Sequence, residues 1–70
     1  MRLKFYIDSG NDAERCGEAL HFGKPISIQG EDPLTGRIKP YRGVVLAVEK
    51  VSAEALGDRW RIAIETDLAH

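Results

Sequence analysis

Hydrophobic and polar residues alternate along much of the chain, and this pattern predicts β-strands. Two segments show the alternation most clearly, with apolar side chains at every second position: Leu3, Phe5 and Ile7, and later Trp60, Ile62 and Ile64. A period of two is typical of a strand that buries one face and exposes the other. We therefore predict strands over residues 2–8 and 59–65.

The middle of the chain predicts two further strands. Apolar residues share one parity over residues 20–28, but Pro25 interrupts them. Because proline cannot donate to a ladder, we expect this segment to be an edge strand or a bulged bend rather than a central strand. Glycine, proline and acidic residues over 30–36 are typical of a turn. The β-branched segment 43–51 is predicted to be the most buried strand. Residues 52–57 are expected to form one helical turn or a loop.

At most one short helix is predicted, between the first two strands. Asn11 followed by Glu14 matches an N-cap with its reciprocal acid. An interior glycine disfavours a helix, so Gly17 is expected to limit it to about residues 12–19. Short connections and about four strands predict a mainly β fold, a small antiparallel curved sheet or half-open barrel. The whole chain, 1–70, is expected to form one small domain.

Composition narrows the classes of function. The 70 residues carry 10 Lys and Arg against 11 Asp and Glu, so the basic excess typical of a nucleic-acid binder is missing. A chain this short rarely frames both a core and a sizeable pocket, and we expect no enzyme. The single cysteine, Cys16, cannot form an internal disulfide, which favours a cytoplasmic setting. No signal peptide or long apolar stretch is found, so we expect no membrane partner.

One string resembles a known catalytic motif. Residues 5–10, Phe-Tyr-Ile-Asp-Ser-Gly, resemble the catalytic loop of pepsin-type and retroviral aspartic proteases. The resemblance implies a homodimeric hydrolase in which Asp8 meets its symmetry mate and the two carboxyls share a proton. Asn11 and Asp12, which follow, depart from that family's pattern, and the chain is short for a lobe with a flap. This hydrolase is the remote alternative, and a turn stabilised by Asp8 explains the same residues.

Metal and cofactor motifs are incomplete. Cys16 and His21 lack the third ligand that zinc requires, because the only other His or Cys is His70, at a terminus that is expected to fray. Five residues separate Gly17 from Gly23, whereas a phosphate-binding loop has four between its glycines. After Lys24, Pro25 supplies no hydroxyl for magnesium. We therefore expect no catalytic residue, no metal and no cofactor.

Basic and aromatic residues in the second half are the candidates for binding. They are Arg37, Lys39, Tyr41, Arg42, Arg59 and Arg61. If the last two strands pair as a hairpin, Glu49 lies opposite Arg59 or Arg61 and neutralises part of the charge on that face of the sheet. Residues 39–45 also resemble the glycine-centred strand of small barrels of the KOW type, which implies RNA or ribosomal partners.

These observations predict a small cytoplasmic, non-enzymatic module that binds another macromolecule. The first hypothesis is protein binding, as an accessory subunit, adaptor, inhibitor or effector. The edge strand at Pro25 would pair with the partner or with a second copy of the chain. The alternative is a nucleic-acid-binding small barrel that uses the six residues above, with binding that weakens steeply with salt. Trp60 is expected in the core, or else exposed as an interface anchor.

Overall fold

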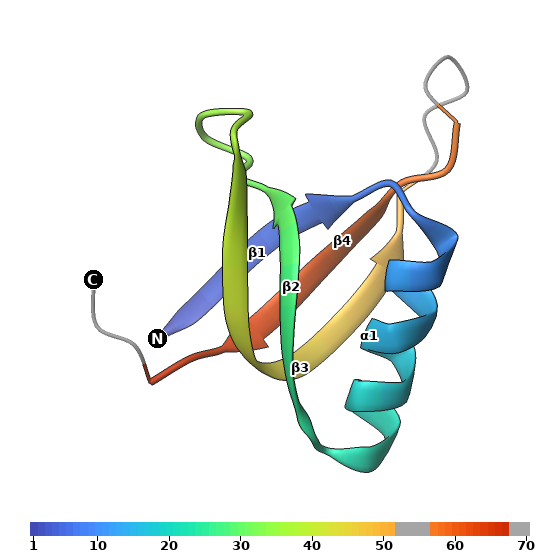
Figure 1. Cartoon of the computed structure of the whole chain (residues 1–70), viewed down its shortest axis with the longest axis vertical. Coiled ribbons are helices and arrows are strands. Elements are labelled where there is room, and N and C mark those ends of the chain that lie inside the picture. The colour runs from blue at the N-terminus through green and yellow to red at the C-terminus, as the bar shows by residue number, and fades with distance from the viewer. Residues whose placement is uncertain (52–56, 68–70) are drawn as a thin grey trace.

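The computed structural model describes residues 1–51 and 57–67. The described part contains four strands and one helix: β1 (Arg2–Ile7), α1 (Gly10–Phe22), β2 (Pro25–Glu31), β3 (Ile38–Lys50) and β4 (Trp60–Glu65). The strands are antiparallel and curl into a ring, with α1 packed at one side (Figure 1). The predicted mainly β, half-open barrel is confirmed. Residues 52–56 of the predicted turn, and His70, lie outside the described residues.

The ring closes unevenly. β1 pairs with β4 along its whole length, whereas β1 and β2 share a single pair, Tyr6 with Glu31. β3 is long enough to change partners, because residues 38–44 pair with β2 and residues 44–50 pair with β4. A register shift just after Val45 accompanies this change. The bend in β3 therefore joins two antiparallel hairpins into one barrel.

The ends of α1 are set by local hydrogen bonds. The Ser9 side chain accepts from the Asp12 amide at 3.4 Å, which makes Ser9 the N-cap. The prediction of Asn11 at this position is wrong, because the helix begins one residue before it. At the other end Gly23 adopts φ 66° and its N–H bonds to the Ala19 carbonyl. This left-handed conformation favours glycine and ends the helix.

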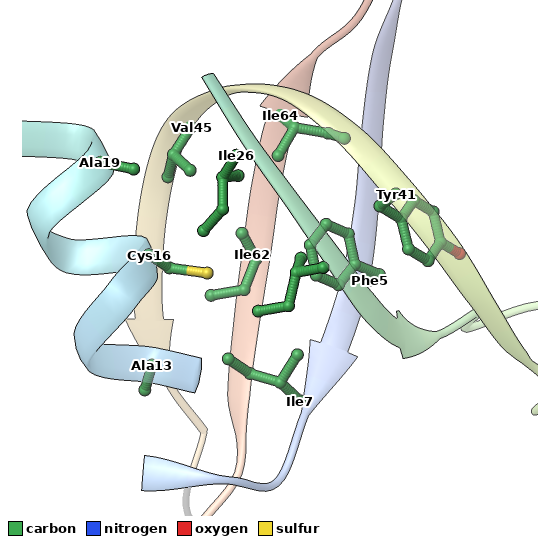
Figure 2. Close-up of a cluster of buried hydrophobic side chains, with 11 residues drawn as sticks. Phe5, Ile7, Ala13, Cys16, Ala19, Ile26, Tyr41, Val45, Ile62 and Ile64 are labelled. Carbon is green, nitrogen blue, oxygen red and sulfur yellow. The ribbon is translucent and has the colours of Figure 1, made fainter. Parts of the chain in front are cut away.

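The helix is confirmed and is longer than the predicted segment 12–19. Its inner face is buried against the barrel: Ala13, Cys16 and Ala19 (Figure 2). This packing outweighs the cost of Gly17, which is about 1 kcal/mol relative to alanine. The predicted strand over 20–28 is wrong in its first part, which is the last turn of α1, and β2 begins at Pro25. No helix among the described residues could span a membrane.

The core lies between the ring and α1. The largest fully buried side chains are Phe5, Ile62, Ile64 and Cys16 (Figure 2). Burial raises the pKa of the Cys16 thiol to about 11, so this side chain stays neutral and packs as a small apolar group. The prediction that 43–51 is the most buried strand is wrong. Of its residues only Val45 is buried, because the outer face of β3 is uncovered.

Candidate functional site

Arg59, one of the predicted binding residues, is held in an ion-pair cluster. Its Nε donates to Asp8 Oδ1 at 2.8 Å, and its two terminal nitrogens donate to the Glu31 carboxylate at 3.2 Å each. The guanidinium carbon lies 5.0 Å from the centre of the Tyr6 ring. The hydrogen bonds that Arg59 donates to Asp8 and then to Glu31 raise the pKa of its guanidinium. Because Asp8 follows β1 and Glu31 ends β2, this cluster joins the two strands where they share their single pair.

Arg61 is neutralised by the cross-strand partner that the sequence suggested. The β3–β4 register places Glu49 opposite Arg61, and a guanidinium nitrogen donates to Glu49 Oε1 at 2.7 Å. This hydrogen bond raises the pKa of Arg61. Trp60 is partly buried and packs against the core, with Lys50 Nζ 5.9 Å from its ring centre. The strand face that carries Arg61 therefore pairs its charge internally.

The other four predicted binding residues lie at or just before the start of β3. Arg37 is exposed and precedes the strand, and Arg42 is exposed within it. The Lys39 ammonium donates to Asp32 Oδ2 at 2.8 Å. Tyr41 is buried, so its ring is not the exposed stacking platform that base recognition requires. Arg37 and Lys39 flank Ile38, which pairs with Glu31, and Glu31 accepts hydrogen bonds from Arg59.

A cleft of about 830 Å³ lies beside the first half of β3; we call it the β3 cleft. Its residues are Lys39, Pro40, Tyr41 and Arg42 on one wall, Met1, Leu3, Lys4 and Thr66 on the other, and Ser27 and Asp32. Consecutive strand residues point to opposite faces, so a cleft lined by four of them runs along the strand's edge. The expectation that so short a chain frames no sizeable pocket is wrong. The bend in β3 moves its first half away from β4 and opens this space.

Within residues 1–51 and 57–67, no strand pairs with the side of residues 38–42 that faces away from β2. We call this side the free edge of β3. The Asp32 amide donates to the Arg37 carbonyl at 2.8 Å, so these two opposite residues form a hydrogen-bonded pair of the β2–β3 hairpin. Because bonding alternates along an antiparallel strand, every second residue directs its backbone groups toward the free edge. These residues are Ile38, Pro40 and Arg42.

β2 is an edge strand, as the sequence predicts, because β1 pairs with it only at Glu31; the free edge of β3 is a second edge. Pro25 is the first residue of β2 and stands opposite Val44. A terminal nitrogen of Arg15 in α1 donates to the Ser27 carbonyl at 3.4 Å, so the helix lies beside the outer edge of β2. The sequence signal for the free edge of β3 was Pro40, since proline within a strand is typical of an edge.

The inner part of the β3 cleft rests on stacked aromatic rings. Tyr41 and Phe5 stack with their centroids 4.2 Å apart and an interplanar angle of 12°. A Cβ at position 30 would overlap the Phe5 ring, so Gly30 allows β2 to approach it. Burial raises the pKa of the Tyr41 hydroxyl, and Figure 2 shows this hydroxyl directed away from the core cluster. The cleft therefore combines an apolar floor with a neutral hydrogen-bonding group.

Searches for similar proteins identify no function. No family model, no curated protein and no solved structure matches the chain. In the part of the chain that the structure describes, no group of three His, Cys, Asp or Glu side chains is placed to hold a metal ion. The β3 cleft and the free edge of β3 are therefore the features from which a function can be inferred.

Proposed function

We propose that this protein is a non-enzymatic binding module that takes an extended segment of a partner protein as an additional strand on the free edge of β3. One observation carries the proposal: four consecutive β3 residues line a cleft of about 830 Å³, and no described strand pairs with their side that faces away from β2. In strand addition, backbone hydrogen bonds supply affinity and contacts of alternate side chains supply specificity. The free edge spans residues 38–42, which suits a partner segment of similar length.

The walls of the β3 cleft support an extended ligand. Leu3 is partly buried beside the core and Tyr41 is stacked on Phe5, so apolar surface lies on the inner side of the cleft. An added strand would direct every second side chain toward this surface. The other side chains would point outward with Arg42. An adaptor, accessory subunit, inhibitor or effector would use such a site in the same way.

Proline substitution at the free edge tests strand addition. Peptides are first selected against the protein from a random decapeptide library. Arg42→Pro removes a backbone N–H directed toward the free edge, whereas Arg42→Gln removes the same charge and keeps that N–H. We expect Arg42→Pro to bind the selected peptides about tenfold more weakly than Arg42→Gln, because a hydrogen bond is lost and the proline ring obstructs the edge.

A second matched pair guards against a folding defect. Ile38 is exposed and, like Arg42, directs its backbone N–H toward the free edge. We expect Ile38→Pro to bind the peptides more weakly than Ile38→Val by the same factor. Circular dichroism checks that each variant is folded. The proposal is contradicted if no peptide is selected, if both proline variants bind as their controls do, or if only oligonucleotides bind. It is also contradicted if the wild type is a dimer that Arg42→Pro dissociates, since a second copy would then occupy the edge.

A further inference from the structure

Most basic residues of this chain already have an acidic partner. Six of the ten Lys and Arg side chains lie within 4.0 Å of a carboxylate: Arg2, Arg15, Lys39, Lys50, Arg59 and Arg61. The other four have no such partner among the described residues: Lys4, Lys24, Arg37 and Arg42. Two of these four, Lys4 and Arg42, line the β3 cleft. Unpaired positive charge is therefore present where the proposed ligand would bind.

The one carboxylate of the β3 cleft is already engaged. Asp32 accepts from Lys39 Nζ at 2.8 Å and from the Leu34 amide at 2.8 Å. The hydrogen bond from Lys39, followed by that from the Leu34 amide, lowers the pKa of Asp32, so this group stays charged and bound to Lys39. Three basic side chains and one acidic side chain line the cleft, although the whole chain carries a net charge of −1. The cleft is thus a local positive site on a slightly acidic protein.

The two unpaired cations share the outer side of the cleft. Leu3 is partly buried and Lys4 is exposed on β1, while Tyr41 is buried and Arg42 is exposed on β3. Each wall therefore offers an apolar side chain inward and a basic side chain outward. A strand laid between the two walls alternates its side chains in the same way.

We infer that the segment bound in the β3 cleft is acidic, with Asp or Glu at every second position and apolar residues between them. This inference rests on the proposed strand addition. The carboxylates face Lys4 and Arg42, and the apolar side chains face Leu3 and Tyr41. Complementary charge of this kind sets partner choice and register as well as association rate. A nucleic acid is the weaker match, because two unpaired cations neutralise few phosphates and the cleft's aromatic ring is already stacked.

The selected decapeptides test the inference directly. We expect Asp and Glu to be enriched at alternate positions, with apolar residues between them. Replacing the acidic residues of a selected peptide by Asn and Gln should weaken binding measured by fluorescence anisotropy. The double variant Lys4→Gln with Arg42→Gln should bind the acidic peptide about tenfold more weakly than the wild type, since two partly exposed ion pairs are lost.

A matched control removes two other unpaired charges. Lys24→Gln with Arg37→Gln changes the net charge equally, but neither residue lines the β3 cleft, so affinity should change less than about twofold after screening at physiological salt. Selected peptides without acidic enrichment, or equal effects of the two double variants, would overturn the acidic specificity and leave strand addition standing. Failure to select any peptide would overturn both proposals. An oligonucleotide that displaces the peptide would assign the cleft to nucleic acid and overturn both as well.

Discussion

Gly43→Ala should destabilise the protein by about 3 kcal/mol, because it places a methyl group where two strands meet. A Cβ at position 43 would overlap the Glu65 carbonyl oxygen and lie 3.3 Å from the Thr66 Cβ. The Glu65 backbone is fixed by its pairing with Val44 and Arg2, so it cannot move without disrupting both ladders. Gly43 does not have a positive φ, so the expected loss of stability comes from the steric overlap alone. Urea denaturation of the variant and the wild type measures the difference.

Gly17→Ala is the matched control for this prediction. It makes the same chemical change in the interior of α1, where a Cβ would meet nothing within 4 Å. Alanine favours the helical conformation, so we expect an increase in the free energy of unfolding of about 0.5–1 kcal/mol. A wild-type denaturation midpoint for Gly43→Ala, or a comparable loss for both variants, would contradict this account of the β3 bend.

Phe5→Ala should lower the free energy of unfolding by about 3–5 kcal/mol. Phe5 is 0% exposed, stacks on Tyr41, and has the Gly30 backbone against its ring, so its removal leaves a cavity under both hairpins. A domain of this length rarely has more than about 3–5 kcal/mol of stability from its core. We therefore expect a largely unfolded protein at room temperature, measured by circular dichroism and by amide chemical-shift dispersion.

Phe22→Ala provides the comparison at an exposed position. Phe22 is 67% exposed at the end of α1 and makes an edge contact with His21. Its loss should change the free energy of unfolding by no more than about 0.5 kcal/mol. Equal stability of the Phe5 and Phe22 variants would show that the aromatic stack under the β3 cleft does not hold the hairpins together.

The local alternation of hydrophobic and polar residues was sufficient to predict much of the fold. The alternation around Phe5 and around Ile62 identified β1 and β4, because one face of each strand is buried and the other is not. The length of α1 depended instead on tertiary contacts, since packing of Cys16 against the barrel compensates for Gly17. A continuous β-branched run likewise gave no sign that β3 changes partners at Val44.

The candidate site was predictable only where partners are close in sequence. Glu49 and Arg61 face each other across one hairpin, so their pairing followed from strand parity. Arg59 instead bonds to Asp8, 51 residues away, and to Glu31, 28 residues away. No local pattern indicates which distant strands meet, so the two acidic partners of Arg59 were not predicted. The β3 cleft was missed because it arises where a neighbouring strand ends.

Amide hydrogen exchange measured by NMR, with and without a selected peptide, tests strand addition most directly. In the free protein the Ile38 and Arg42 amides should exchange rapidly and the Tyr41 amide slowly, since only the last is directed toward β2. Saturating peptide should slow exchange at Ile38 and Arg42 by about tenfold or more, as new backbone hydrogen bonds form. Unchanged exchange at both amides, or protection confined to β4 and α1, would contradict the assignment of the binding site to the free edge of β3.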